Sequence, residues 1–300
     1  MSELPSHTPV MLRAVVELLR PARARCLLDC TVGLGGHAEA LLSLAPATMS
    51  YIAIDRDAEN LRRARERLRP FDAGGRVRFF QANFSQVRDV LEAANVQTVD
   101  GVLADLGFAS TQVDDPSRGL SFAADGPLDM RMDREEGEQT AEDLVNTLGE
   151  EELANLIFQY GEERHSRRIA RAIVAARKIK RIQRTLELAE IVSRALGGRH
   201  GQKIHPATRT FQDLRIAVND ELRSLEELLS RVPDFLASGG RAVIISFHSL
   251  EDRRVKNAFS AMESVGKGKI ITPKPLVADD EEVQINSRSR SAKLRCIERI

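Results

Sequence analysis

Short apolar runs alternate with longer amphipathic stretches over the first hundred residues of the chain. This alternation is typical of βα units that build a parallel sheet, because such strands are buried on both faces whereas each covering helix is buried on one. Apolar, β-branched runs predict four strands, at residues 26–29, 51–54, 77–81 and 99–104. Helical periodicity begins between them, near Ala38, Ala58 and Gln86. The first third of the chain is therefore expected to form four successive βα units.

A fifth apolar run, at residues 242–247, follows the Gly239-Gly240 pair, which predicts a turn ahead of another strand. Residues 269–272 and 294–299 are expected to add a terminal antiparallel pair. Between Gly107 and about Phe211 the alternation stops, and a loop rich in glycine, proline and aspartate leads into helical periodicity. The pattern predicts an α/β fold with a mostly parallel, seven-stranded sheet and an all-helical insertion after the fourth strand. The expected division is 1–107 and 212–300 for the sheet domain and 108–211 for the insertion.

Composition limits the class of protein. With 42% apolar residues among 300, the chain can fill a sizeable core. No run approaches the roughly 20 apolar residues that cross a membrane, and residues 1–7 lack the features of a signal peptide. The three cysteines, Cys26, Cys30 and Cys296, form no CxxC pair, which argues against both a disulfide framework and a zinc site. A cytoplasmic protein without a bound metal is expected.

Charge is unevenly distributed, although Lys+Arg and Asp+Glu both total 44. Residues 125–163 contain 13 acidic and 2 basic residues, whereas residues 164–209 contain 13 basic and 2 acidic ones. On a helix expected at 163–181, Ile169 and Ile173 share one face by the 3.6-residue period. The distribution predicts an anionic partner, such as phosphate, for the opposite face. That basic face consists of Arg164, Arg168, Arg171 and Lys178.

A glycine-rich turn, Gly33-Leu-Gly35-Gly36-His37, follows the first predicted strand. Backbone amides at such a turn, where a helix begins, can approach a ligand closely, although the same turn can simply connect a strand to a helix. Asp29 ends the strand ahead of the glycines, where its carboxylate would attract a methionine ammonium group and repel a pyrophosphate. Ala38 also leaves the G-x-G-x-x-G dinucleotide pattern incomplete.

Asp55 ends the second predicted strand, where an acidic side chain can accept hydrogen bonds from both ribose hydroxyls of a nucleoside. Its alternative role is to cap the next helix, for which Asp57 is also placed. After the third strand, Phe84 is placed to wall an adenine ring, although core packing is the commoner role of an isolated phenylalanine. Together, the turn and the two carboxylates indicate an adenosyl nucleoside that carries an ammonium group.

The fourth predicted strand ends in Asp105-Leu-Gly-Phe108, at the edge where open α/β sheets bind ligands. Amino-methyltransferases often place an (Asp/Asn/Ser)-Pro-Pro-aromatic motif here, and this chain lacks both prolines. The hypothesis is that Asp105 and the Leu106 carbonyl hold a target amine while Phe108 stacks on its base; alternatively, Asp105 caps the following turn. His248, after the fifth strand, can orient substrate or pass on a proton, but a structural hydrogen-bonding role is favoured.

With these residues located, the chain resembles the RsmH/MraW family of rRNA (cytosine-N(4))-methyltransferases from end to end. One segment departs from the family pattern: Phe108-Ala-Ser-Thr111 stands where many relatives read Val-Ser-Ser-Pro. The resemblance rests on long motifs in order along the chain: His7-Thr-Pro-Val, Gly33-Leu-Gly-Gly-His37, Ala53-Ile-Asp-Arg-Asp57, Asp105-Leu-Gly, Gln112-Val-Asp-Asp, Arg118-Gly-Leu-Ser-Phe, Gly126-Pro-Leu-Asp-Met-Arg-Met-Asp133, Tyr160-Gly-Glu-Glu-Arg, Arg168-Ile-Ala-Arg-Ala-Ile173, His205-Pro-Ala-Thr-Arg-Thr-Phe-Gln212, Ser246-Phe-His-Ser-Leu-Glu-Asp-Arg253 and Arg288-Ser-Arg-Ser.

The resemblance implies a class I, Rossmann-like methyltransferase fold with S-adenosyl-L-methionine as cofactor. It also implies that the helical insertion recognises the substrate, a cytidine near the decoding centre in the 16S rRNA of the small ribosomal subunit. The reasoning from residues adds Asp29 and Gly33 to the cofactor site, and His248 with the basic face to the RNA site. The cofactor contacts that the resemblance implies are Gly35, Gly36, His37, Asp55, Phe84, Asp105 and Gln112.

Two other classes stay open at the level of sequence. A nicotinamide-dependent oxidoreductase would also use Asp55, but Asp29 and the incomplete glycine pattern disfavour it. A non-catalytic RNA-binding protein would use the basic face, and the ligand-binding edge of the sheet would have no function. The oligomeric state also stays open, with a homodimer as one option.

Overall fold

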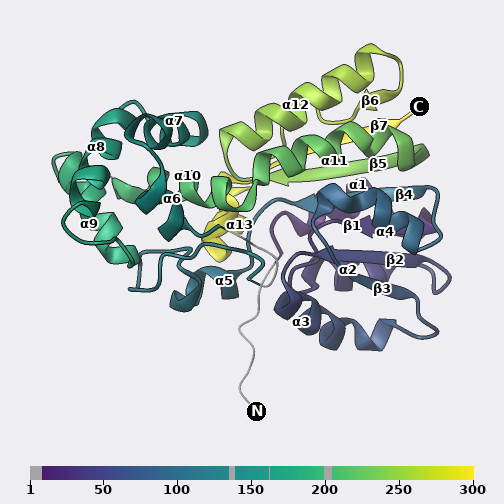
Figure 1. The fold of residues 1–300 in the computed structure, drawn as a ribbon. Coiled ribbons are helices and arrows are strands. Elements are labelled where there is room, and N and C mark those ends of the chain that lie inside the picture. Colours follow the sequence, from purple (N-terminus) through teal and green to yellow (C-terminus); the bar gives the residue numbers. More distant parts are fainter. Residues whose placement is uncertain (1–8, 135–138, 162, 199–204) are drawn as a thin grey trace. The chain divides into compact units, whose positions relative to one another are not determined.

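The computed structural model describes residues 9–134, 139–161, 163–198 and 205–300, so the start of the His7 motif lies outside the described residues. The chain forms two compact units, one from Met1–Ala109 with Leu222–Ile300 and the other from Ser110–Glu221 (Figure 1). The first is called the sheet unit below and the second the helical unit. A division at residue 211 would cut through α10 (Ala207–Asn219), whose buried residues Phe211 and Leu214 belong to the helical unit's own core.

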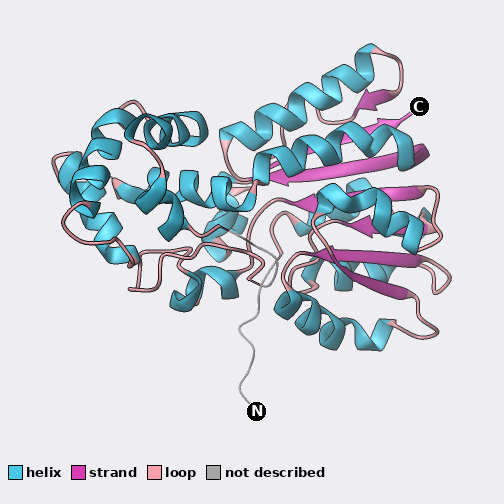
Figure 2. Cartoon of the chain, viewed as in Figure 1, coloured by secondary structure: helices cyan, strands magenta, loops and turns pink. Residues whose placement is uncertain are grey.

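The sheet unit contains one seven-stranded sheet with the strand order β3-β2-β1-β4-β5-β7-β6. The first five strands are mutually parallel, and β7 runs antiparallel to both of its neighbours, as the sequence predicted (Figure 2). The strands are β1 (Cys26–Asp29), β2 (Ser50–Asp55), β3 (Val77–Gln81), β4 (Val99–Asp105), β5 (Leu236–Ser246), β6 (Gly268–Ile270) and β7 (Lys293–Arg299).

Helices cover both faces of this sheet, because successive strand residues point to opposite sides and both sides are apolar. In β1, Leu28 packs into one core with α4 (Val87–Ala93), α11 (Glu221–Phe235) and α12 (Ser249–Ser264). Its neighbour Leu27 packs into the other core. That core is completed by α1 (Leu12–Leu19), α2 (Gly36–Leu44) and α3 (Ala58–Leu68), and the short helix α13 (Asp280–Ile285) follows β6.

The strand order reverses at β1, because β2 lies on one side of it and β4 on the other. In open α/β sheets the ligand crevice lies beyond the carboxyl ends of the strands at such a reversal. Asp29 ends β1 and Asp105 ends β4, so both stand at this edge. The topology therefore places these predicted site residues where this fold class binds ligands.

One predicted turn is part of a strand instead. Gly239 and Gly240 lie inside β5, which starts at Leu236, and the β4–β5 register shifts at this level. Gly239 adopts φ +75°, a conformation that costs little only for glycine. The pair therefore bends the strand as a bulge and does not end it.

The helical unit contains no strand among its described residues, and an isolated bridge joins Pro127 to Arg184. Its core is apolar and includes Ile157, Ile169 and Leu214. None of the helices in the described ranges of the chain is long and apolar enough to cross a membrane. The helices of this unit are α5 (Ser110–Asp114), α6 (Ala141–Thr147), α7 (Glu150–Gly161), α8 (Ser166–Arg177), α9 (Thr185–Ala195) and α10.

Candidate active site

The glycine-rich turn between β1 and α2 is shaped by two glycines with left-handed backbone. Gly33 has φ +54°, and Gly35, the residue before α2, has φ +80°. Both conformations are unfavourable for residues with a Cβ. The Gly33 N–H donates to Asp55 Oδ2 at 2.8 Å, which ties the turn to the end of β2. This link brings two of the predicted cofactor contacts together.

The N-terminal segment packs directly on the start of α2. An ideal Cβ at Gly36 would lie 2.6 Å from Pro9 Cγ, so only glycine leaves room for that ring. Beside it, buried His37 places Nε2 2.9 Å from the carbonyl oxygen of Val10. A carbonyl can only accept, so Nε2 carries the hydrogen of this bond. The first turn of α2 is thus clamped to residues 9–10.

Asp29 is a buried carboxylate held by two donors. Its Oδ1 accepts the Thr31 N–H at 3.1 Å, and its Oδ2 accepts the hydroxyl of fully buried Tyr51 at 2.9 Å. Burial raises the pKa of Asp29 to about 7, although both hydrogen bonds oppose the rise. A cationic ligand group beside Asp29 would favour its ionised form. The surroundings therefore suit an ammonium group.

Asp55 connects three segments around the end of β2. Besides the Gly33 N–H, its carboxylate accepts the Asp57 N–H at 2.8 Å and the Asn60 amide at 3.3 Å, both at Oδ1. The cap of α3 is Asp57, whose side chain accepts the Glu59 N–H at 2.9 Å, so the prediction for Asp57 is confirmed. A carboxylate has about four lone-pair sites, so Asp55 can also accept from ribose hydroxyls.

Asp105 combines a buried oxygen with an unusual pKa. Its backbone N–H donates to Thr31 Oγ1 at 2.7 Å, while Oδ2 lies 3.9 Å from His37 Nδ1. Its Oδ1 is buried and makes no hydrogen bond within the part of the chain that the structure describes. Burial raises the pKa of Asp105 to about 7, and the nearby carboxylates of Asp29 and Glu251 contribute to the rise. An unsatisfied buried oxygen is costly and points to a ligand or a proton.

The donor set of this edge fits S-adenosyl-L-methionine. The left-handed turn at Gly33 and Gly35 lets a ligand approach the backbone closely, Asp29 suits an ammonium group and Asp55 can accept from ribose hydroxyls. Phe84 opens a 3-10 helix (Phe84–Gln86), where it is half-buried against the core. The core role that competed with adenine binding is thus present, and adenine contact stays a prediction.

Two further predicted site residues belong to different units. Phe108 lies in the sheet unit and is 36% exposed, and its stacking on a base stays a prediction. Next to it, Gly107 lets the Phe247 ring approach, because an ideal Cβ there would lie 3.0 Å from that ring. Gln112 belongs to α5 of the helical unit and is buried. Its contact with the cofactor stays a prediction.

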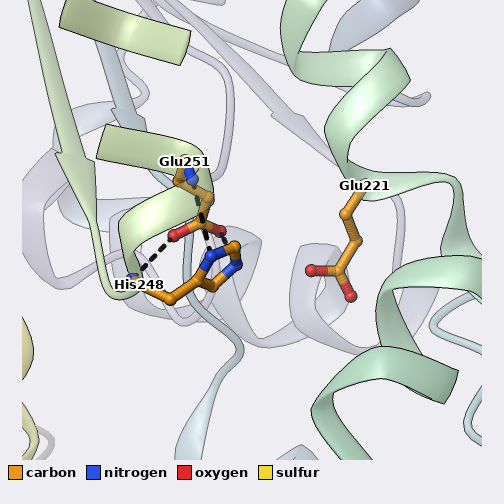
Figure 3. Close-up of side chains that lie close together, drawn as sticks. All are labelled: Glu221, His248 and Glu251. Carbon is orange, nitrogen blue, oxygen red and sulfur yellow. Dashed lines mark hydrogen bonds and ion pairs between the residues drawn. The ribbon is translucent and has the colours of Figure 1, made fainter. Parts of the chain in front are cut away.

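His248 is the cap of α12, the structural role that the sequence favoured (Figure 3). Its Nδ1 accepts the Glu251 N–H at 3.4 Å, and the Glu251 carboxylate accepts the His248 N–H at 3.3 Å. The same carboxylate accepts the Phe247 N–H at 2.8 Å and lies 3.1 Å from His248 Nε2, outside hydrogen-bond geometry. Contact of His248 with RNA stays a prediction.

The predicted basic face is exposed on the helical unit, but its helix is shorter than expected. Because α8 spans Ser166–Arg177, Arg164 lies in the preceding turn and Lys178 is the C-terminal cap. Arg171 pairs with Glu150 at 3.4 Å. By contrast, Arg177 donates to backbone carbonyl oxygens of residues 145 and 148 and so has a structural role. All four residues of the basic face are exposed.

Sequence reasoning missed four residues that organise this site. Tyr51 contacts the carboxylate of Asp29, Thr31 holds the end of β4, and Val10 holds the ring of His37. The fourth, Glu251, fixes the loop after β5. A tyrosine in an apolar strand indicates core packing before it indicates a hydrogen bond, and backbone carbonyls such as that of Val10 leave no trace in a sequence.

The chain is similar in sequence to known proteins over almost its whole length. A sequence model of the MraW methylase family matches residues 5–300. The chain is 49% identical to the ribosomal RNA small subunit methyltransferase H of Cyanothece sp., over 98% of this chain and 95% of that protein. It is 47% identical to the protein of the same name from Solidesulfovibrio magneticus, over 99% and 96% of the two chains.

Among solved structures, Aeropyrum pernix fibrillarin with natively bound S-adenosyl-L-methionine aligns with 95% of this chain and 73% of its own, at 10% identity and a TM-score of 0.41. The sheet has the class I, Rossmann-like methyltransferase fold that the resemblance implied. The family assignment rests on the sequence matches, which cover nearly the whole chain. This chain belongs to the MraW methylase family, and its cofactor is S-adenosyl-L-methionine.

Proposed function

We propose that this protein methylates the exocyclic N(4) amine of a cytidine in the decoding region of 16S rRNA, in the cytoplasm. The observation that carries the proposal is Asp105, which ends β4 and has a buried oxygen that makes no hydrogen bond among the described residues. The names of the relatives, ribosomal RNA small subunit methyltransferase H, support RNA as the substrate.

Asp105 suits an exocyclic amine because such a group carries N–H donors beside its lone pair. When Asp105 Oδ1 accepts one N–H, the amine is held in a fixed orientation, and positioning lowers the barrier of a direct transfer. S-adenosyl-L-methionine supplies the methyl group as a sulfonium, so the protein needs no nucleophile. The exposed ring of Phe108 would stack on the cytosine.

The cysteines support the exocyclic amine, and not ring carbon 5 of cytosine, as the site of methylation. Methylation at ring carbon 5 of cytosine requires a cysteine thiolate that attacks the ring. All three cysteines of this chain are buried, and burial raises the pKa of each thiol: that of Cys296 to about 12 and those of Cys26 and Cys30 above the usual range. Buried, neutral thiols are poor nucleophiles. An amine requires no covalent adduct with the protein.

The helical unit is the part that we expect to bind the RNA. Its basic face is exposed and lies along α8 and its two ends, and the other side of this helix, with Ile169 and Ile173, is packed into the core. Phosphate contacts position a nucleic acid without reading its sequence, so this face would add affinity while the crevice selects the base.

Mass spectrometry of nucleosides from small-subunit rRNA treated with the enzyme and cofactor tests the proposal. We expect N(4)-methylated cytidine as the product. The triple variant Cys26→Ser, Cys30→Ser, Cys296→Ser should keep most of this activity if it folds. A 5-methylcytidine product, or a folded triple variant without activity, would overturn the mechanism, and binding of RNA without any transfer would indicate a non-catalytic protein.

A further inference from the structure

We propose that His37 is a positioning residue that acts through Asp105, by taking over the proton that Asp105 accepts from the substrate amine. The inference rests on the proposed function, in which Asp105 contacts the amine. It assigns to His37 a role in addition to the cofactor contact that the family resemblance implies. The geometry that carries it is the placement of one imidazole between Val10 and Asp105.

The Val10 carbonyl fixes the tautomer of His37. Because this oxygen accepts from Nε2 at 2.9 Å, the neutral ring carries its hydrogen on Nε2 and its lone pair on Nδ1. The lone pair therefore belongs to the nitrogen that lies 3.9 Å from Asp105 Oδ2. That distance is longer than a hydrogen bond, and a small rotation of either side chain would close it.

The surroundings of Asp105 make it a base near neutral pH. Asp29 at the end of β1 and Glu251 on α12 are both acidic, and they oppose a further negative charge at the end of β4. His37 on α2 lies beside Asp105 and can offset this charge when it is protonated. A carboxylate with a pKa near the working pH is suited to accept a proton during the reaction.

The proton step balances in the following way. Methylation leaves a positive charge on the amine nitrogen; an N–H bond then breaks, its electron pair stays on nitrogen, and an O–H bond forms at Asp105. The proton next moves to Nδ1 of His37, which becomes an imidazolium that donates to Asp105 on one side and to Val10 on the other. Asp105 is thereby ionised again, and His37 releases the proton to solvent when the product leaves.

A purely structural His37 would act only as a clamp between α2 and residues 9–10, where Pro9 packs on Gly36. Two substitutions separate the roles. In His37→Gln, the amide Nε2–H can still donate to Val10, but no basic nitrogen stands at the position of Nδ1. In His37→Phe, both the clamp and the proton acceptor are lost. The unfolding temperature reports whether the clamp survives, and kcat measured at saturating cofactor is not changed by a weaker cofactor contact.

We expect His37→Gln to keep the unfolding temperature of the parent, while kcat at saturating cofactor and neutral pH falls about 10- to 100-fold, part of the usual range for acid–base assistance. The pH profile of kcat should also lose the limb that corresponds to the Asp105–His37 pair. A His37→Gln enzyme with the parent's kcat and pH profile would overturn the proposal and leave His37 a clamp.

Nitrogen NMR of the imidazoles in the cofactor-free protein provides a readout that does not depend on activity. Neutral His37 should show a protonated Nε2, and its titration should move to lower pH in Asp105→Asn, because the carboxylate that favours the imidazolium is gone. A protonated Nδ1, or a titration unaffected by Asp105→Asn, would contradict the pairing. If this coupling is present while mass spectrometry finds no methylated cytidine, the proposed function fails and the pairing stands.

Discussion

Each unit of this protein has an aspartate with a buried carboxylate oxygen that makes no hydrogen bond among the described residues, but the two aspartates have different surroundings. Asp105 stands at the carboxyl edge of the sheet, within reach of His37 and near Asp29. Asp213 lies in the middle of α10, fully buried, with the acidic Glu163 nearby. Burial raises the pKa of Asp213 to about 8.

A raised pKa is common to both aspartates, so other features must decide which of them we expect in an active site. We expect Asp105 to bind a ligand because of its neighbours: a glycine turn, a second buried carboxylate and a histidine at the reversal point of a sheet. Asp213 instead packs against the backbone of Gly161, where an ideal Cβ would lie 2.4 Å from the carboxylate oxygens of Asp213. We therefore expect Asp105 to serve the reaction and Asp213 to reduce stability.

The largest expected effect is that of Asp105→Asn. Activity should fall by about two to four orders of magnitude, since the base is lost. The variant should nevertheless be more stable than the parent, by on the order of 4 kcal/mol near pH 8, because the folded state no longer has to ionise a buried acid whose pKa is about 7. Methyl transfer assays and urea unfolding would test both effects. An active Asp105→Asn enzyme would remove the contrast between the two carboxylates.

Asp213→Asn should increase stability without loss of activity. The pKa of Asp213 is raised in the folded state. Its contribution to the free energy of unfolding is therefore most favourable below about pH 4 and is lost as the pH rises through 8. The free energy of unfolding of the variant should therefore exceed that of the parent by on the order of 4 kcal/mol near neutral pH, and by little or nothing near pH 4. Urea unfolding at pH 4, 7 and 9 would measure this, and a difference that does not change with pH would argue against a buried, titrating Asp213.

Asp55→Ala should weaken cofactor binding by about 1.5–3 kcal/mol, the usual scale for hydrogen bonds to a charged group. Asp55 also holds the Gly33 amide, so part of the loss would come from the turn itself. Calorimetry with S-adenosyl-L-methionine measures the effect, and Glu66→Ala, a change at an exposed position of α3, is a suitable control. An unchanged affinity in a folded Asp55→Ala variant would remove Asp55 from the cofactor site.

The smallest expected effect concerns the basic face. Reversal of Arg164 and Arg168 to Glu should weaken RNA binding and flatten its salt dependence, by about 0.7–0.9 in the slope of log K against log salt for each lost phosphate contact. Cofactor affinity should barely change. Reversal of Arg62 and Arg88, which are exposed on the sheet unit, is the matched control. An equal change of slope for both pairs would show that RNA binding does not depend on the basic face.

The sheet was predictable because buried strands leave continuous apolar runs in the sequence. β1 and β3 have the predicted bounds, and the antiparallel end of the sheet was also expected. The prediction of a turn at Gly239-Gly240 was wrong because a bulge and a turn both use glycine, and only pairing with β4 distinguishes them. The shorter α8 has a similar cause, since charge and periodicity continue past the point where the backbone leaves the helix.

At the site, sequence patterns correctly placed the side chains of Asp29, Asp55 and Asp105 at strand ends, where we expect them to act. They did not identify partners that come from distant segments through the backbone, such as the Val10 carbonyl beside His37. Asp213 was also missed, because an aspartate on a helix is expected to face solvent and only packing shows that it does not. Contacts of this kind follow from tertiary structure and not from local spacing.

The insertion of the helical unit between β4 and β5 has a consequence for folding. Asp105 pairs with Ile245, so the centre of the sheet cannot close until the whole insertion has been synthesised. Closure of a loop of this length carries an entropic cost, which falls if the insertion has already collapsed around its own core. We expect pulse-labelled hydrogen exchange to show amides of α7 and α8 protected before those of β5. Until then, a nascent chain on the ribosome exposes the unpaired edge of β4, the kind of surface that chaperones shield from aggregation.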